Sequence, residues 1–423
     1  MGAAPTDAAA ALHPYTLAGL PLLGAEWLIM PGYYDADNHY YESRDCFTRH
    51  IEPSMRERAI RVDRDAAGSE VVLVGDRPFT FLADAFLDVT AKPGALRDML
   101  RSLSSGSYHA SDAVEPVQPE YVQRDARLAV MDRQGLEAIL LFPTLAVCVE
   151  HFMKDDPDQL YANFHAFNLW LDEDWGFDQA GRLFAAPLLS LCDVDRAVAE
   201  LEFVLARGAR VVSLRPGPAF GRSPADPHFD PFWARLNEAR VPVAFHIGES
   251  GYNEIMAPYW GEEPNPSSHR QSAFQWTTTY GDRPIMDTFA ALVLHNLFGR
   301  FPDVRCLSVE NGSLWVPYLM KVMNKMNGMG RNGPWLGGPI TERPSEIFKR
   351  HVFVSPYHEE DVVALSETIG VSQVLFGSDY PHPEGLADPR EFAERVAPLG
   401  DADVQAIMRD NLRGLLGSVS VAA

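Results

Sequence analysis

The chain has 423 residues, of which 46% are hydrophobic and 22% are charged, so its composition favours a large folded core over disorder. Its formal net charge of −22 argues against nucleic acid and anionic membranes as partners, because both would repel an acidic surface. The four cysteines include no CxxC pair, which argues against a thiolate zinc site. We find neither a signal peptide nor an apolar run long enough for a membrane span, and we therefore predict a cytoplasmic protein.

Eight short apolar or β-branched runs, each bounded by turn residues, are predicted to be strands. The first ends near His39, and the others cover residues 136–144, 182–191, 210–217, 241–249, 304–312, 351–357 and 373–381. Helical patterns separate most of them, at residues 193–208, 231–240, 284–301 and 361–369. Strand–helix alternation repeated about eight times predicts an α/β fold whose parallel sheet closes into a (β/α)₈ TIM-type barrel. A doubly wound open sheet is the alternative.

Two segments are too long to be simple connections in a bare barrel. Residues 45–125 follow the first strand and include a hairpin pattern at residues 59–82. Residues 251–282 follow the fifth strand and are rich in aromatic side chains, including Trp260 and Trp276. Loops longer than about 15 residues are usually functional, so we predict that both segments cover the mouth of the barrel, the second as an aromatic lid. The predicted organisation is an N-terminal extension (1–32), one barrel domain (33–416) and a tail (417–423).

Polar side chains stand at the ends of the predicted strands. Asp37 and His39 are two residues apart and therefore share one face of the first strand. His246, Glu310 and Asp379 end the fifth, sixth and eighth strands. An open sheet would concentrate functional groups at one switch point, whereas a barrel collects them from several strand ends. The spread of these residues over four strand ends therefore favours the barrel.

This set of imidazoles and carboxylates suits Zn²⁺, Mn²⁺ or Fe²⁺. We predict that one or two such ions are held by Asp37, His39, His246, Glu310 and Asp379. A bound ion would lower the pKa of water from about 15.7 to about 7 and so provide hydroxide to attack a carbonyl. Asp379 would take up the proton, and His246 and Glu310 are the other candidate catalytic residues.

Four stretches of the chain resemble the amidohydrolase superfamily, specifically its amidohydrolase-2 branch. They are DADNHYYE at the first strand, FHIGE at the fifth, LFGRFPDVRCLSVENGSLW across the sixth and VLFGSDYPHPEG at the eighth. The resemblance covers about residues 34–416. It implies a metal-dependent (β/α)₈ barrel that hydrolyses amides, esters and lactones or decarboxylates aromatic and related acids. It also implies metal ligands at Asp37, His39, His246 and Asp379.

The chain departs from common patterns of this family at three positions. Asp37 stands where many members have histidine, which resembles the decarboxylase-type subset. Glu310 stands where those decarboxylases usually carry histidine, and the fourth strand ends in Arg215 without a lysine that could bridge two metals. Three carboxylates exceed the charge of one divalent ion, and a buried uncompensated charge is costly. A site with two ions, bridged by Asp37 or Glu310, therefore remains an alternative to a site with one.

We predict a metal-dependent hydrolase that acts on an acyl derivative of a small molecule. The carboxylate-rich site and aromatic lid are similar to those of a superfamily group that hydrolyses acyl-CoA thioesters with a non-haem diiron centre, which makes such a thioester the leading candidate. The alternatives are non-oxidative decarboxylation of an aromatic acid and an inactive barrel used for binding. A homodimer is the expected assembly. Further candidates to support the ligands or contact substrate are His295, His382, Arg215, Arg49, Arg58, Trp260 and Trp276.

Overall fold

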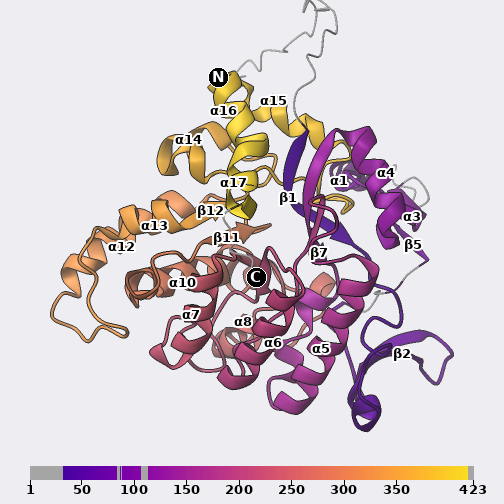
Figure 1. Ribbon diagram of the computed structural model, residues 1–423. Coiled ribbons are helices and arrows are strands. Elements are labelled where there is room, and N and C mark those ends of the chain that lie inside the picture. Colours follow the sequence, from indigo (N-terminus) through magenta and orange to yellow (C-terminus); the bar gives the residue numbers. More distant parts are fainter. Residues whose placement is uncertain (1–31, 83–85, 87, 106–112, 418–423) are drawn as a thin grey trace, which may run out of the picture. The chain divides into compact units, whose positions relative to one another are not determined.

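Parallel strands and helices alternate along the chain in the computed structural model, which describes residues 32–82, 86, 88–105 and 113–417 (Figure 1). The parallel strands are β1 (Tyr33–Tyr40), β7 (Leu136–Pro143), β8 (Leu183–Ala185), β9 (Val212–Leu214), β10 (Val243–His246), β11 (Cys306–Val309) and β12 (Val352–Val354). One sheet has the order β1-β7-β8, and a second has the order β12-β11-β10-β9. These strands lie within the predicted runs.

Hydrogen bonds join the two sheets into a ring. Beyond the end of β8, the Leu189 N–H donates to the Ser213 carbonyl of β9 at 3.0 Å. Residues 374–380 occupy the eighth position, paired with β12 by a parallel bridge and with β1 by the Ala36 N–H, which donates to the Phe376 carbonyl at 2.8 Å. This eighth segment lacks the continuous pairing of a regular strand. The predicted (β/α)₈ barrel is confirmed, and the open sheet is excluded.

Helices follow the strands, and the longer ones are α4 (Arg124–Gln134), α5 (Pro157–Asp174), α6 (Val194–Ala206), α7 (Asp230–Ala239), α10 (Asp282–Leu294), α12 (Trp315–Met329), α13 (Pro344–His351) and α14 (Val362–Ile369). The C-terminal part adds α15 (Phe392–Val396), α16 (Asp401–Gln405) and α17 (Asn411–Gly417). Asp193 caps α6 by accepting a hydrogen bond from the Arg196 N–H at 3.0 Å. The helix predicted at residues 284–301 is in fact two, because Asn296 adopts a left-handed φ of 56° between α10 and α11 (Leu297–Arg300).

Alternate residues of the strands supply two separate apolar clusters. In β7, Ala138 and Leu140 belong to the cluster inside the barrel, whereas Ile139 and Leu141 belong to the larger cluster beneath the outer helices. This period of two is the one that a strand with two buried faces requires. The inner cluster also takes in leucines of α17, so the C-terminal helix completes the barrel core.

The segment after β1 divides into two parts with different positions. Its first part is an antiparallel hairpin of β2 (Ile60–Arg64), β3 (Glu70–Val74) and β4 (Arg77–Pro78). The Ile60 N–H donates to the Asn163 side chain of α5 at 2.7 Å, and the hairpin lies beside that helix (Figure 1). The second part contains β5 (Val89–Ala91), α1 (Leu96–Ser105), β6 (Val114–Pro116) and α3 (Pro119–Val122). The prediction that the whole insertion covers the mouth was therefore wrong for the hairpin, whose apolar face packs outside the barrel.

The segment after β10 folds into α8 (Tyr252–Met256) and α9 (Ala273–Thr278), joined by short helical turns. Trp276 and Tyr280 line a cavity together with Asp37 and Glu310 at the strand ends. The predicted aromatic lid after the fifth strand is therefore confirmed.

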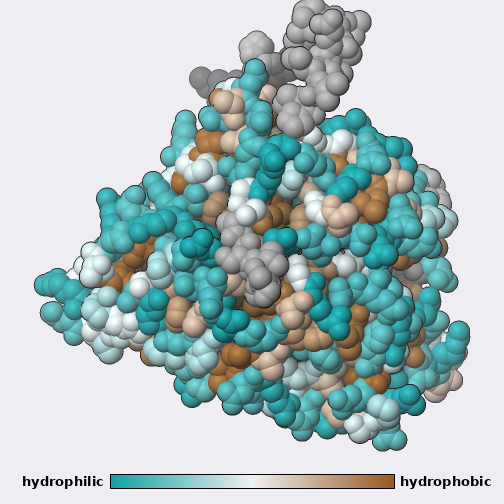
Figure 2. Space-filling model, viewed as in Figure 1, coloured by the Kyte–Doolittle hydropathy of each residue, from teal (hydrophilic) through white to brown (hydrophobic). Residues whose placement is uncertain are grey.

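Some predictions concern features that the structure does not test. The predicted N-terminal extension and tail lie almost wholly outside the described residues, so the domain organisation stays a prediction. Within the described part of the chain, none of the helices combines the length and apolar character needed to cross a membrane. The face shown in Figure 2 is mostly hydrophilic, in line with the charged composition. The cytoplasmic location and the homodimer remain predictions.

His351, at the end of α13, is a buried histidine outside the strand-end cluster. Its ring stacks on Phe298 with centroids 4.4 Å apart, and its Nδ1 lies 2.9 Å from the Val304 carbonyl oxygen. Burial lowers the pKa of His351 to about 4, and the nearby Arg305 guanidinium adds to this effect. Because unfolded histidine has a pKa near 6.5, this group stabilises the fold fully above that pH, and the contribution is lost as pH falls towards 4.

We expect the free energy of unfolding of His351→Gln to fall less at acid pH than that of the wild type. The wild-type chain should lose about 3 kcal/mol from this group between pH 6.5 and pH 4, and the variant should not. Urea unfolding midpoints across this pH range measure the difference. The matched control is His228→Gln at an exposed site, which should keep the wild-type pH dependence. Identical pH dependence in wild type and His351→Gln would contradict the assignment.

Candidate metal centre

The five predicted ligands come together where the barrel strands end. Asp37 and His39 lie near the end of β1, His246 is the last residue of β10, Glu310 follows β11, and Asp379 lies in the eighth segment, next to Tyr380, which pairs with Asn38 of β1. Ligand atoms within 4.8 Å of one another form two overlapping quartets, Asp37–His39–His246–Glu310 and His39–Glu310–Asp379–His382. The geometry thus adds a sixth residue, His382, which the sequence had suggested only as a supporting group.

His39 lies at the centre of the cluster. Its Nε2 is 3.3 Å from Asp37 Oδ1, 3.4 Å from Glu310 Oε2 and 3.4 Å from Asp379 Oδ1. His246 Nε2 is 3.2 Å from both Glu310 Oε2 and His39 Nε2. Two ligand atoms each about 2.1 Å from one tetrahedral ion would lie about 3.4 Å apart. The side chains therefore already have the spacing of a metal coordination shell.

Two features of individual atoms fit a divalent ion. Asp37 Oδ1 is buried and has no hydrogen-bond partner, which is costly for a carboxylate oxygen unless a cation binds it. His246 Nδ1 lies 2.8 Å from the Ile247 carbonyl oxygen, which can only accept a hydrogen bond, so Nδ1 carries a proton. In the neutral ring, Nε2 then carries the free lone pair, which points towards the other predicted ligands.

Two of the predicted ligands, Glu310 and Asp379, have a backbone conformation that is unfavourable in free energy. Glu310 has a φ of 56° and Asp379 has a φ of 57°, in the left-handed region that residues other than glycine rarely adopt. Such conformations cost about 1–3 kcal/mol and persist where the surrounding structure enforces them, often at functional sites. The backbone thus carries strain at two of the five predicted ligands.

The His382 imidazole contacts the Asp379 carboxylate and orients it. Asp379 Oδ1 lies 2.7 Å from His382 Nδ1, and His382 Nε2 lies 3.0 Å from Thr144 Oγ1. The imidazole therefore connects Asp379 with the residue that follows β7, and its ring packs on His39 with centroids 4.0 Å apart. This contact fixes which way the Asp379 carboxylate faces.

Asp35 is a buried residue that the sequence analysis did not single out. Its carboxylate accepts hydrogen bonds from the Asp37 N–H and the Ser378 N–H, both at 3.0 Å, and from Asn38 Nδ2 at 3.0 Å. It therefore ties the strand that carries Asp37 to the segment that carries Asp379. The DAD pattern was a visible signal, but the partner Ser378 is 343 residues away in the chain.

The cluster holds protons in a way that a metal ion would change. Burial alone would lower the pKa of His246, but the Asp37 and Glu310 carboxylates raise it to about 10. Burial and the charges of Glu310 and Asp37 raise the pKa of Asp379 well above its usual range. Burial also opposes ionisation of Glu310, yet the two imidazoles hold the pKa of its carboxyl well below the ordinary value. Without another cation, a protonated imidazole thus offsets part of the negative charge of the carboxylates.

A cavity of about 260 Å³ opens beside the cluster. It is lined by Asp37, Ile247, Trp276, Tyr280, Glu310, Pro356, Tyr357, His358, Glu359, Gly377, Ser378, Asp379, Glu384 and Gly385. These lining residues all belong to the described part of the chain, and none is lysine or arginine. We call this space the reaction cavity. Tyr280 belongs to the predicted lid and Tyr357 to the end of the seventh predicted strand, but the sequence did not mark either as a site residue, because an aromatic residue in a loop carries no signal of where it points.

Several of the further candidates have partners elsewhere. Arg215 pairs with Glu150 at 3.4 Å and donates to a backbone carbonyl, so it does not neutralise Glu310. The others are Arg49, paired with Asp45 and Asp174; Arg58, paired with Asp156; His295, 2.8 Å from Ser223 Oγ; and Trp260, exposed and packed on Phe274. Of the described residues, only Trp276 and His382 among these seven candidates lie at the reaction cavity or the ligand quartets.

The model of the amidohydrolase family matches residues 34–417. The chain belongs to the amidohydrolase family. The crystal structure of an amidohydrolase from Mycobacterium avium subsp. paratuberculosis K-10 matches with a TM-score of 0.82 and 40% sequence identity, over 91% of this chain and 99% of that one. The resemblance seen in the sequence is thereby confirmed, and it narrows the chemistry of this amidohydrolase to metal-dependent hydrolysis or decarboxylation.

Decarboxylases share the fold of this amidohydrolase at low identity. 2,6-Dihydroxybenzoate decarboxylase from Rhizobium matches with a TM-score of 0.58 and 17% identity, over 92% of this chain and 99% of that one. A dihydroxybenzoic acid decarboxylase from Polaromonas sp. JS666, with bound manganese and 2-nitroresorcinol, matches with a TM-score of 0.56 and 14% identity, over 92% and 97%. Comparison with curated protein sequences gave no match.

We expect His246→Gln to weaken metal binding by this amidohydrolase at least about 100-fold, since even the outer partner of a ligand is worth 10–100-fold. Equilibrium dialysis against buffered Mn²⁺ or Zn²⁺, followed by elemental analysis, measures the effect. His295→Gln removes an imidazole that pairs with Ser223 and should bind metal like the wild type. Equal metal content in the two variants would show that His246 is not a ligand.

Proposed function

We propose that the protein is a metal-dependent hydrolase that cleaves an uncharged acyl derivative, with an acyl thioester as the leading substrate class. The observation that carries this proposal is the position of Glu310. Its Oε2 lies 3.4 Å from His39 Nε2 and 3.2 Å from His246 Nε2, and it belongs to both ligand quartets. A carboxylate shared in this way can bridge two metal ions, whereas a neutral histidine offers only one free lone pair.

Charge supports two ions rather than one. When all three are ionised, as metal ligands must be, Asp37, Glu310 and Asp379 bring three negative charges to one buried cluster. One divalent ion would leave an uncompensated negative charge in a desolvated site, which is unfavourable. Two ions would leave one positive charge, which favours an anionic nucleophile and a developing oxyanion. Carboxylate and imidazole donors suit Fe²⁺, Mn²⁺ or Zn²⁺.

A divalent ion bound here would supply a Lewis acid and lower the pKa of a water ligand to about 7. The protein's own residues would then manage protons and orientation. Asp379, positioned by His382, would accept the proton from the nucleophile and pass it to the leaving group. Burial raises the pKa of Tyr280 well above its usual range, so its hydroxyl stays protonated and can donate a hydrogen bond to the oxyanion.

The lining of the reaction cavity favours a neutral substrate. Beyond the three carboxylates of the cluster, it presents Glu359 and Glu384, and no arginine or lysine is among its lining residues. The free carboxylate of an aromatic acid would find no arginine or lysine among these lining residues, and Glu359 and Glu384 would repel it. A neutral acyl carbonyl does not meet this repulsion. This supports hydrolysis over decarboxylation.

The first test is turnover by protein reconstituted with Fe²⁺, Mn²⁺ or Zn²⁺. We expect about two ions per chain, because two are needed to compensate three carboxylates. The protein should then release free thiol from N-acetylcysteamine thioesters, which are uncharged. Chelator-treated protein is the control and should release none. Release of CO₂ from 2,6-dihydroxybenzoate without any thiol release would overturn the proposal in favour of decarboxylation.

The Tyr280 hydroxyl gives a second test. Tyr280→Phe should lower kcat for thioester hydrolysis by about 10²-fold, the usual value of one oxyanion donor, while the metal content stays the same. Steady-state kinetics on metal-replete protein measure this. Tyr318→Phe makes the same change on an exposed face of α12 and should leave kcat at the wild-type value. An equal kcat in Tyr280→Phe would show that this hydroxyl does not contact the transition state.

A further inference from the structure

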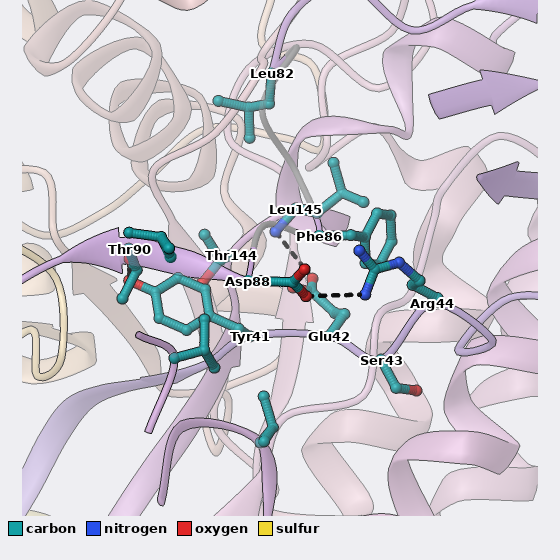
Figure 3. Close-up of a pocket in the computed structure, with 13 residues that line it drawn as sticks. Tyr41, Glu42, Ser43, Arg44, Leu82, Phe86, Asp88, Thr90, Thr144 and Leu145 are labelled. Carbon is teal, nitrogen blue, oxygen red and sulfur yellow. Dashed lines mark hydrogen bonds and ion pairs between the residues drawn. The ribbon is translucent and has the colours of Figure 1, made fainter. Parts of the chain in front are cut away.

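A second cavity, of about 540 Å³, is larger than the reaction cavity (Figure 3). We call it the side pocket. Its walls come from three segments at the mouth: the residues after β1, the insertion near β5, and the residues after β7. They are Tyr41, Glu42, Ser43, Arg44, Leu82, Phe86, Asp88, Val89, Thr90, Val117, Val122, Thr144 and Leu145. Its volume is in the range of about 300–1,000 Å³ that holds small molecules, whereas the reaction cavity is below that range.

The chemistry of the side pocket is mostly apolar. Leu82, Phe86, Val117 and Leu145 contribute hydrophobic walls, and an ion pair between Arg44 and Asp88 stands among the lining residues (Figure 3). Apolar lining with a few placed polar groups is typical of a ligand site.

Glu42 is the buried polar group of this pocket. Its Oε1 accepts hydrogen bonds from the Leu145 N–H at 2.9 Å and the Ala146 N–H at 2.8 Å. These bonds hold the carboxylate in place at the wall. Arg44, the one cation among the described lining residues, is already paired with Glu70 and Asp88. A ligand carboxylate would be repelled by Glu42 and would compete with those acids for Arg44, so the pocket suits an uncharged apolar group.

One imidazole ring separates the side pocket from the metal centre. Thr144 lines the pocket, and its Oγ1 lies 3.0 Å from His382 Nε2. The Nδ1 of the same ring lies 2.7 Å from Asp379 Oδ1, which lines the reaction cavity. Tyr41, also in the pocket wall, packs on His382 with ring centroids 6.1 Å apart. The His382 side chain therefore stands between the side pocket and Asp379, the group that would move the proton.

We propose that the side pocket binds the apolar acyl group of the substrate while the acyl carbonyl is held at the metal centre. This inference rests on the proposed hydrolase function and adds to it the substrate class, a medium-length or cyclic uncharged acyl derivative. Burying each methylene is worth about 0.8 kcal/mol, which is about fourfold in binding. Four methylenes in the pocket would therefore favour a long acyl chain over acetyl by at least about 100-fold.

The test compares acyl chains in variants that fill the pocket. Leu82→Trp and Val117→Trp place a large ring among the lining residues, and Leu314→Trp makes the same change at an exposed site after β11. For each protein, kcat/KM is measured with acetyl and octanoyl N-acetylcysteamine thioesters. We expect the octanoyl-to-acetyl ratio to exceed 100 in wild type and Leu314→Trp and to fall at least tenfold in both pocket variants. Because it is a ratio, it does not depend on the fraction of folded enzyme. An unchanged ratio in both pocket variants would overturn the proposal.

Binding of a neutral apolar probe separates failure of the pocket from failure of the function. The fluorescence of N-phenyl-1-naphthylamine should rise on binding to wild type and Leu314→Trp, and its Kd should weaken at least tenfold in Leu82→Trp and Val117→Trp. The probe should also compete with octanoyl thioester hydrolysis. Probe binding that is lost in the variants, in a protein that hydrolyses no thioester, would retain the apolar site and reject the hydrolase. Probe binding that the variants leave unchanged, or that does not compete, would reject the side pocket as the acyl site.

Discussion

The arrangement of the barrel mouth depends on one electrostatic constraint. Three carboxylates and three imidazoles are gathered there, and the described residues bring neither lysine nor arginine to the reaction cavity. In a desolvated site, such an excess of negative charge must be balanced. Protons can do so only in part, as the raised pKa of His246 and Asp379 shows. Divalent ions balance it better, and their chemistry then decides what the site can do.

The barrel provides the rigid frame that this concentration of charge needs. Asp35 joins the first strand to the segment that closes the ring, so Asp37 and Asp379 are linked by a short path of hydrogen bonds. Glu310 and Asp379 keep a left-handed backbone, which only a well-determined environment maintains. The strained backbone of Glu310 and Asp379 and the hydrogen bonds of Asp35 thus act together: they hold side chains close to one another whose charges would otherwise drive them apart.

His382 stands between two cavities of different character, in contact with Thr144 of the side pocket and Asp379 of the reaction cavity. The reaction cavity is acidic and small, and the side pocket is larger and mostly apolar. Substrate recognition would therefore be divided, with the carbonyl recognised by charge and the acyl group by hydrophobic burial. The lid and the second part of the insertion after β1 supply the walls, which explains why both segments are long although the barrel itself needs only short connections.

Much of this could be predicted from the sequence. The eight apolar runs, the helices between them and polar residues at the strand ends are local patterns, and they were enough for the barrel and for Asp37, His39, His246, Glu310 and Asp379 as neighbours. The family resemblance rests on the same local stretches. Local patterns failed where the conformation depends on distant partners: the hairpin packs on α5, and the helix pattern at residues 284–301 breaks at Asn296.

The fold class, the family and the kinds of side chain at the strand ends could be predicted from the sequence, because strand periodicity and residue chemistry are properties of short segments. Only the tertiary structure decided that Asp35 bonds Ser378, that His382 stands between Asp379 and Thr144, and that Arg215 pairs with Glu150. It also decided which aromatic residues of the lid face the cluster. These relations join residues far apart in the chain, and closure of the barrel sets them rather than any local preference.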